Sequence, residues 1–280
     1  MFMLGIINAI VGGFTSVLYK KRIENMPFAD FQKTYSVLNA CLAIPCYFIL
    51  SKVVTLDYAE KVPVSLGAIL FLLLFLVLRI VSNTAQGRLL KDKSIDVNII
   101  TILMSVSCFL SLIGTTSNLK VNIVCSMLTA CFGVLLITVD FKAMEFKFKR
   151  EALVFLIAAF IANGTRTAMC SYLLTYFTPI QLSMMEFLNY MLVYLVMFKE
   201  GRITLDNVKK IIPLTFIAIA TIVCSYLLAK TITLAIATSF VSAVSVAVFS
   251  IIMLKSKLSK VTWLGIGIVI CSLTAFRMFS

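Results

Sequence analysis

Residues 140–151, with the sequence DFKAMEFKFKRE, form the longest charged segment of the chain and lie at its middle. Five stretches with few or no charged residues precede this segment, and five follow it. A helix that crosses a membrane needs about 20 mostly apolar residues, and each stretch is close to that length. We therefore predict an all-α integral membrane protein with ten transmembrane helices, at residues 3–19, 31–51, 64–87, 97–116, 121–139, 152–174, 180–198, 211–229, 234–254 and 261–278.

The composition of the whole chain favours the same class of protein. Of the 280 residues, 61% are hydrophobic and 13% are charged, and the mean hydropathy is +1.06. A soluble globular chain has about 45–50% apolar and about 25% charged residues. These values exclude a water-soluble domain, a disordered chain and a disulfide scaffold. Ten helices of about 20 residues use about 200 residues, which leaves no room for a folded soluble domain.

The two halves of the chain have prolines and glycines at matching positions. A shift of 152 residues places Pro27, which opens the second predicted helix, on Pro179, which opens the seventh. The same shift places Gly12 on Gly164. Because five helices is an odd number, two such halves insert with opposite orientations, as in the inverted repeats of many secondary transporters. The predicted domains are a five-helix repeat, a charged linker and a second five-helix repeat, at residues 1–140, 141–151 and 152–280.

The basic residues predict an orientation. The chain has 25 Lys and Arg residues against 12 Asp and Glu, and 17 of the 25 lie in the five odd-numbered loops between the predicted helices. This excess is better explained as topology information than as a nucleic-acid surface, because cytoplasmic loops of membrane proteins are enriched in Lys and Arg. We therefore expect these loops in the cytoplasm and both termini outside. Blocks such as residues 20–22 (KKR) are expected to meet anionic lipid headgroups.

Four segments resemble the drug/metabolite transporter superfamily, in particular its ten-helix, EamA-like branch. Two of them open the halves, and two join the last two predicted helices of each half: NAIVGGFTSVLYKKRIENMPFADFQ (8–32), AFIANGTRTAMCSYLLTYFTPIQLS (159–183), GTTSNLKVN (114–122) and LKSKLSKVTWLG (254–265). The resemblance covers essentially the whole chain. It implies two inverted five-helix repeats and transport of small metabolites by alternating access: amino acids, nucleotide sugars, phosphorylated sugars, choline or drugs. It also implies cytoplasmic termini, the reverse of the orientation expected from the charges.

Arg79 lies deep in the third predicted helix. Ser82, Asn83 and Gln86 follow it at spacings of three, four and seven residues, which places all four side chains on one helical face. A polar face of this width is too costly to expose to lipid. It therefore faces either a cavity or another helix, in which case Arg79 is a structural anchor.

Arg166 and Glu186 lie about eight and six residues from the tight turn that joins the sixth and seventh predicted helices, so both reach a similar membrane depth. Glu186 shares a helical face with Asn189 and Tyr190. Two interpretations stay open. The two charges form a structural pair with each other, or Arg166 binds a substrate anion while Glu186 takes a substrate amine or a coupling proton.

The first, third, sixth, seventh and ninth predicted helices all carry polar faces, and together they predict one central polar path. Several tyrosines are further candidates to stack on a ligand: Tyr35, Tyr172, Tyr190, Tyr194 and Tyr226. The predicted substrate-binding residues are Arg79, Asn83, Arg166, Glu186, Asn189 and Tyr190, with Glu186 also the candidate for proton coupling.

These features predict a secondary active transporter for a small polar metabolite, with amino acid-like and other anionic or zwitterionic compounds first. A cation carrier of the same fold, choline-like or for drugs, is an alternative, and a channel or accessory membrane subunit is an alternative of another class. An enzyme is not expected, because the chain has no histidine and no phosphate-binding glycine loop. We expect no cofactor, metal site or nucleic-acid partner. The expected partners are a small molecule and the bilayer, in a monomer or homodimer of the bacterial inner membrane.

Overall fold

A computed structural model describes residues 2–53, 62–115, 121–140, 145–146, 150–229, 232–255 and 259–279. These residues form ten helices, each of which coincides with a segment predicted to be helical. Their bounds are α1 (Phe2–Glu24), α2 (Phe28–Val53), α3 (Leu66–Lys91), α4 (Val97–Thr115), α5 (Val121–Thr138), α6 (Arg150–Leu173), α7 (Pro179–Met197), α8 (Leu205–Ala229), α9 (Ile232–Leu254) and α10 (Lys260–Phe279).

Local capping fixes where the helices that carry the site begin. The hydroxyl of Ser65 accepts a hydrogen bond of 3.1 Å from the backbone N–H of Ala68 at the start of α3. At the start of α7, Thr178 and Gln181 form a reciprocal capping box around Pro179. Proline suits this position because its missing N–H would have no helical partner there. The prediction that Pro179 opens a helix is confirmed.

A short β-hairpin departs from the all-helical expectation. Strand β1 (Val139–Asp140) pairs antiparallel with β2 (Glu145–Phe146), at the border of the predicted charged linker. The sequence analysis predicted no strand here, because two residues are too few to show an alternating pattern. The rest of the linker before Arg150 lies outside the described residues.

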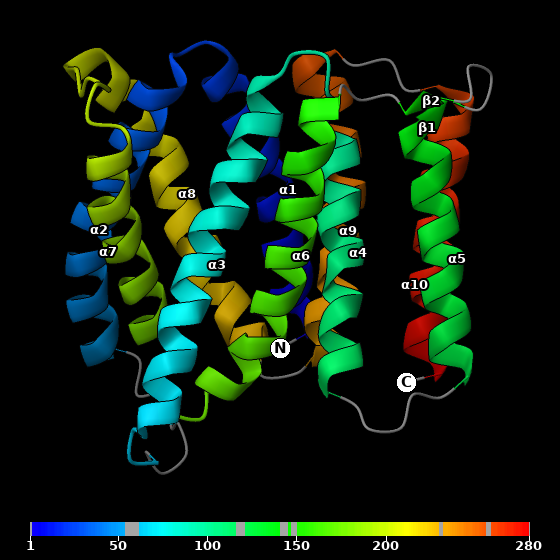
Figure 1. Ribbon diagram of the computed structural model, residues 1–280, viewed down its shortest axis with the longest axis horizontal. Helices are drawn as coiled ribbons and strands as arrows, with labels where there is room; N and C mark the ends of the chain where they lie inside the picture. Colours follow the sequence, from blue (N-terminus) through cyan, green and yellow to red (C-terminus); the bar gives the residue numbers. More distant parts are fainter. Residues whose placement is uncertain are drawn as a thin grey trace.

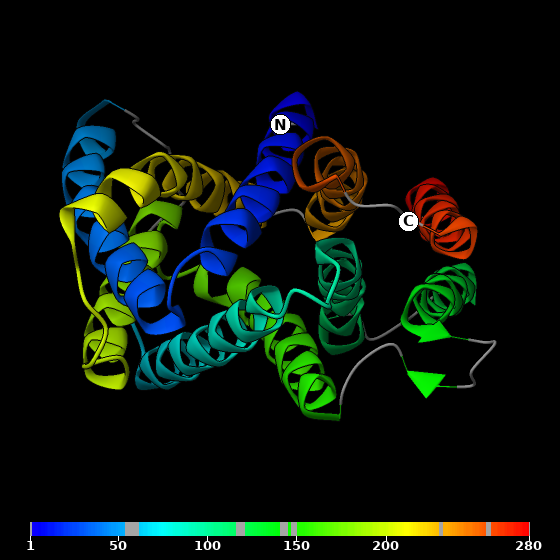
Figure 2. The ribbon, with the colours of Figure 1, turned by 90° about the horizontal axis from the view of Figure 1, so that it is seen from above.

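The helices run in roughly the same direction, up and down (Figure 1), and form a bundle more than one helix deep (Figure 2). The largest helix contacts are α5 with α10, α1 with α9, α3 with α6, α4 with α6, α2 with α7, α1 with α8, α4 with α9 and α2 with α8. Seen from above, α5 and α10 form a pair at one side of the molecule (Figure 2). The remaining eight helices surround the residues considered below.

The two ends of the bundle differ in charge. Both termini lie at the same end (Figure 1). The α1–α2, α3–α4 and α7–α8 connections are described in full, and all three lie at the opposite end. The basic residues of these connections are therefore gathered at one end of the molecule, as predicted.

Several helices meet the requirements of a membrane span. Among the described residues, five helices are long and apolar enough to cross a membrane: Met3–Glu24, Leu66–Lys91, Arg150–Leu173, Pro179–Met197 and Leu205–Tyr226. Large apolar side chains also point outward. On α3, Leu66, Leu70 and Val77 are more than half exposed, which suits a surface in contact with lipid rather than water. The fold is compatible with a multi-pass, all-α membrane protein.

A glycine sets the distance between α1 and α9. A Cβ atom added at Gly13 would lie 2.5 Å from the Cβ of Ser245 and 2.9 Å from the backbone nitrogen of Val246. The backbones of the two helices therefore approach each other more closely than any side chain at position 13 allows. Small residues at such contacts are typical of helix packing in membranes.

We expect Gly13→Ala to destabilise the protein, because backbone atoms of α9 cannot rotate away from the added methyl group. Overpacking of this kind costs about 1–3 kcal/mol, and the measurement is thermal unfolding in detergent. Gly267→Ala in α10 is the control, since an added Cβ there meets no atom within 4 Å. Equal melting temperatures for the two variants would contradict the close approach of α1 and α9.

Candidate functional site

An ion pair between α3 and α7 lies at the centre of the candidate site. The Nε atom of Arg79 donates to Oε1 of Glu186 at 2.5 Å. The Glu186 side chain is fully buried, whereas the Arg79 side chain retains 17% of its accessible surface. The guanidinium also lies over the ring of Tyr190, 6.0 Å from its centroid. Arg79 is therefore compensated both by a carboxylate and by an aromatic face.

Tyr226 of α8 completes the surroundings of Glu186. Its hydroxyl donates to Oε2 of Glu186, so both carboxylate oxygens are hydrogen-bonded. The Tyr226 ring lies 6.4 Å from that of Phe75 on α3. The sequence analysis considered Tyr226 only as an aromatic residue that stacks on a ligand. Its role as a hydrogen-bond donor to a buried carboxylate was not predicted.

Arg166 of α6 also lies close to Phe75. Its guanidinium carbon is 5.8 Å from the centroid of the Phe75 ring. One terminal nitrogen, Nη2, donates to Oδ1 of Asn163 at 3.3 Å. The Nε atom of Arg166 is buried and has no hydrogen-bond partner among the described residues. Arg166 is thus the least compensated charge in this part of the bundle.

The other three predicted site residues lie near the ion pair. Asn189 donates to the backbone oxygen of Leu76 at 3.2 Å and ties α7 to α3. The Tyr190 hydroxyl is buried without a hydrogen-bond partner among the described residues. Asn83 lies farther along α3 and donates to the hydroxyl of Tyr194 at 3.2 Å. The contacts of the two asparagines are structural, and the Tyr190 hydroxyl retains unused hydrogen-bonding capacity.

Glu186 forms its ion pair with a different arginine from the one proposed as the structural alternative from the sequence. That alternative paired it with Arg166, its neighbour across the α6–α7 turn. Within the described part of the chain, the ion pair of Glu186 is with Arg79. The physical reason is the contact of α3 with α6 and α7, which brings Arg79 to Glu186 and inserts Phe75 beside Arg166.

A cavity of about 240 Å³, with both polar and apolar residues in its wall, lies near Arg166 but is not lined by any of the three charged residues. Its wall includes Asn163, which accepts the hydrogen bond from Arg166. The lining residues are Ser16, Gln86, Leu90, Val97, Ile100, Thr101, Met104, Ser105, Asn163 and Ser242. They come from α1, α3, α4, α6 and α9. Four of the five helices match the predicted polar path, but α4 replaces α7 in the cavity wall.

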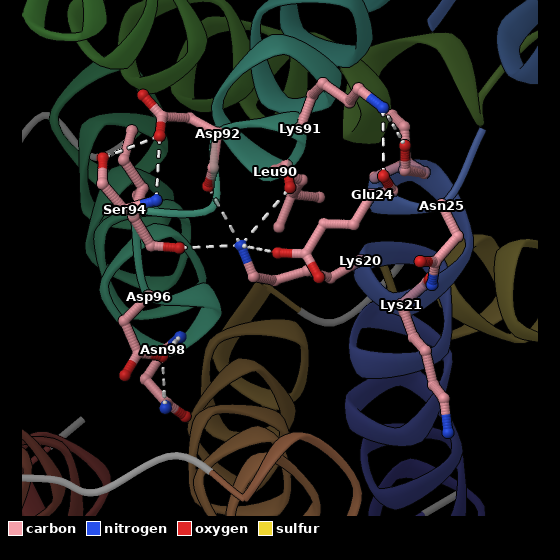
Figure 3. Close-up of polar contacts among 12 residues, drawn as sticks. Lys20, Lys21, Glu24, Asn25, Leu90, Lys91, Asp92, Ser94, Asp96 and Asn98 are labelled. Atoms are coloured by element: carbon pink, nitrogen blue, oxygen red, sulfur yellow. Dashed lines mark hydrogen bonds and ion pairs between the residues drawn. The ribbon is translucent and has the colours of Figure 1, made fainter. Parts of the chain in front are cut away.

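Two lysines tie the ends of α1 and α3 together (Figure 3). The buried ammonium group of Lys20 on α1 donates to the backbone oxygens of Leu90, Asp92 and Ile95, at 3.3, 3.2 and 2.8 Å. It also lies 3.0 Å from Oε1 of Glu24. The carbonyl groups at the C-terminus of a helix lack helical partners, and a cation there also complements the helix dipole. Lys20 therefore caps the end of α3.

The capping is reciprocal. The Nζ atom of Lys91 on α3 donates to the backbone oxygens of Ile23, Glu24 and Met26, at 2.9, 3.2 and 2.5 Å. We call the contacts of Lys20 and Lys91 the lysine clamp. Lys20 was expected to meet lipid headgroups, but it is buried at 5% exposure and binds backbone carbonyls instead. Its neighbour Lys21 is exposed, as expected.

The clamp and the cavity share a residue. The side chain of Leu90 lines the cavity, and its carbonyl oxygen accepts from Lys20. Val97, at the start of α4, also lines the cavity just beyond the clamped turn. The clamp therefore lies directly between the cavity and the basic end of the bundle.

The described residues contain no group of three or more Cys, Asp or Glu side chains arranged to hold a metal ion.

Comparisons with known proteins bear on the fold alone. No family model and no curated protein matches the chain. In all, 23 chains of solved structures match it. One, described only as the crystal structure of a protein, covers 97% of this chain and 99% of its own, with a TM-score of 0.62 and 11% sequence identity. At that identity the match bears on the fold alone, and it shows that the arrangement of the helices has been observed experimentally.

The Arg79–Glu186 pair can be tested with a double-mutant cycle. Removing one partner of a buried pair leaves an uncompensated charge and costs about 3–5 kcal/mol. We expect Arg79→Met and Glu186→Gln each to lower the free energy of unfolding by about that amount. We expect the double variant to lose much less than the sum of the two. Denaturant unfolding in detergent provides the measurement.

Tyr226→Phe is the matched control for this cycle, because it removes one hydrogen bond to Glu186 and no charge. We expect this substitution to lower the free energy of unfolding by about 1 kcal/mol. Strictly additive losses in the double variant would show that the two charges do not stabilise each other.

Proposed function

We propose that this chain is a secondary active transporter that moves a small anionic or zwitterionic metabolite across a membrane by alternating access. The observation that carries the proposal is the state of Arg166. Arg79 and Glu186 compensate each other, whereas Arg166 has no carboxylate within ion-pair distance among the described residues. The cluster therefore keeps one net positive charge inside the helix bundle.

An uncompensated charge in a membrane is costly, at about 2.5–3.5 kcal/mol on insertion scales. Such charges mark substrate pathways in membrane proteins. Arg166 contacts the wall of the cavity through its hydrogen bond to Asn163. A carboxylate or phosphate in that cavity would supply the missing counter-charge, and a guanidinium binds both with good geometry. We assign Arg166 as the group that binds the substrate anion.

A cationic substrate, the alternative of the same fold, is less favoured. Glu186 is the carboxylate of this cluster, and both of its oxygens already accept hydrogen bonds from Arg79 and Tyr226. A quaternary amine would have to displace a guanidinium that is paired at 2.5 Å. The same pairing makes exchange of substrates a simpler driving mechanism than protonation of Glu186.

The helix contacts support a ten-helix protein built from two inverted repeats. If the two halves are exchanged, α1 takes the place of α6, α2 that of α7, and so on up to α5 and α10. This exchange converts the α1–α9 contact into α6–α4 and the α1–α8 contact into α6–α3. The α2–α7, α4–α9 and α5–α10 contacts convert into themselves. All seven are among the largest contacts of the structure. The α2–α8 contact departs from this pattern, because its counterpart α7–α3 is much smaller. The other large contacts follow the exchange expected for a two-fold axis between residues 1–140 and 152–280.

We propose that the chain belongs to the drug/metabolite transporter superfamily, in its EamA-like branch; the helix contacts and the resemblance of the four segments support this proposal. The basic end of the bundle is proposed to face the cytoplasm, following the positive-inside rule. Both termini then lie outside. The membrane is proposed to be the inner membrane of a bacterium.

In this transporter the lysine clamp closes the cavity at its basic end. Opening the cavity towards that end requires the ends of α1 and α3 to separate, which breaks six hydrogen bonds from two lysines. On this proposal, the structure is a state held closed at the basic end of the bundle.

The anion site is tested by ligand-dependent thermal shifts. The ligands are carboxylates, phosphorylated metabolites, amino acids and quaternary amines. A ligand at a hundredfold excess over its dissociation constant stabilises the folded state by about 2.7 kcal/mol. We expect anionic or zwitterionic compounds to raise the melting temperature, and we expect Arg166→Gln to abolish the shift because the uncompensated charge is removed.

Arg88→Gln is the matched control for this test. The guanidinium of Arg88 also lies over a phenylalanine ring, 4.5 Å from the centroid of Phe28, but Arg88 is exposed at the end of α3. Its variant is expected to keep the ligand response. Shifts produced by quaternary amines alone, or unchanged shifts in Arg166→Gln, would overturn the proposed anion site.

The clamp is tested by the labelling of a cysteine in the cavity. In sealed vesicles, a membrane-impermeant thiol reagent is applied from the side of the basic loops to Ser16→Cys. We expect Lys20→Met to increase the labelling rate several-fold, because it frees the end of α3. Lys21→Met is the control, since Lys21 is exposed and makes no clamp contact. A lower melting temperature with unchanged labelling would mean that the clamp only stabilises the fold.

A further inference from the structure

We infer that the transported anion carries several hydroxyl groups, as a hydroxylated carboxylate of about four to six carbons does. This inference rests on the proposed function and specifies its substrate class. It comes from the hydrogen-bonding state of the cavity wall, which is an observation separate from the charge on Arg166.

The polar side chains of the wall have already used most of their donors. The hydroxyl of Ser16 donates to the backbone oxygen of Gly12 at 3.0 Å, and that of Thr101 donates to the backbone oxygen of Val97 at 2.9 Å. The amide nitrogen of Gln86 donates to the hydroxyl of Ser82 at 3.0 Å. Each of these groups keeps an oxygen that accepts hydrogen bonds. The wall therefore presents acceptors to whatever fills the cavity.

Asn163 extends this pattern towards the cation. Its amide nitrogen donates to the hydroxyl of Ser107 at 2.7 Å and to the backbone oxygen of Met104 at 3.3 Å. Its oxygen accepts from Arg166. Arg166 does not line the cavity itself, but its positive charge lies one hydrogen bond behind the wall, through Asn163. A ligand that matches this cavity has an anionic group and several donors.

Hydroxyl groups satisfy this wall better than an ammonium group does. An ammonium ion in the cavity would need a carboxylate, because an unpaired buried charge is far more costly than a hydrogen-bonded hydroxyl. The carboxylate of this region, Glu186, is already paired with Arg79. Neutral hydroxyls need only acceptors, which the wall supplies.

The cavity volume limits the size of the ligand. At 240 Å³ it holds about eight water molecules, at about 30 Å³ each. It is smaller than the range of about 300–1,000 Å³ that holds drug-sized ligands. A carboxylate of four to six carbons fits this space.

The test compares anions that differ only in their hydroxyl groups. Gluconate is paired with hexanoate and threonate with butyrate, and each is titrated against the melting temperature of the full-length protein in detergent. A site built to hydrogen-bond hydroxyls rejects an analogue that lacks them. We therefore expect the hydroxylated member of each pair to bind at least tenfold more tightly. We expect Arg166→Gln to abolish both responses.

Thr101→Val removes one acceptor of the wall while keeping the shape of the side chain. It is expected to weaken the binding of the hydroxylated anions several-fold and to leave hexanoate and butyrate unchanged. Thr129→Val on α5 is the matched control. The Thr129 hydroxyl makes the same type of bond, to the backbone oxygen of Cys125 at 2.8 Å, but Thr129 is exposed and lies outside the cavity.

The outcomes separate this inference from the proposed function. Equal binding within each pair, or tighter binding of the unhydroxylated anion, would overturn the substrate class and leave the anion transporter in place. An equal effect of the Thr101 and Thr129 substitutions would also overturn it. Failure of every anion to raise the melting temperature would overturn the proposed function itself.

Discussion

Charge compensation inside the helix bundle is the constraint on which the candidate site depends. Arg79 and Glu186 occupy neighbouring helices and form a short ion pair, and Tyr226 occupies the second carboxylate oxygen. A buried pair of this kind adds little net stability, because the cost of desolvation nearly cancels the attraction. Its main effect is on the arrangement of the helices. It fixes α3 against α7 and leaves Arg166 as the uncompensated cation beside the cavity.

The cavity lies between two kinds of polar contact. On one side is the charge cluster, which in the proposed transporter selects the ligand. On the other is the lysine clamp, which in that proposal controls the opening of the cavity. Leu90 and Asn163 connect the cavity to these two features, because each lines the cavity and takes part in one of them. In the proposed transporter, substrate binding and opening would therefore be coupled through one small volume shared by five helices.

The helices and most of the site residues follow from the sequence for clear physical reasons. Long apolar stretches bounded by charges predict helices well, and all ten predicted segments are helical. A charged side chain in such a stretch is costly enough to predict a polar surrounding, and Arg79, Arg166 and Glu186 all have one. The partner of Glu186 could not be predicted, because spacing along the chain says nothing about which distant helix packs beside α7.

Two features of the site carry no signal in the sequence. Thr101 and Ser105 of α4 look like the hydroxyl residues that pack helices together in any membrane protein, and only the fold places them in the cavity wall. Lys20 looks like an ordinary basic residue at the end of a membrane span. Its partners are backbone carbonyl groups, which every residue type supplies.

The dependence of the clamp on backbone acceptors has a consequence for evolution. A salt bridge between side chains leaves a trace in related sequences, because a change in one partner favours a compensating change in the other. The acceptors of Lys20 and Lys91 are carbonyl oxygens, with Glu24 as the one side-chain partner of Lys20. The residues that supply these oxygens are free to diverge without weakening the clamp. Across relatives of this chain, the two lysines would then persist as isolated invariant positions with almost no covarying partners.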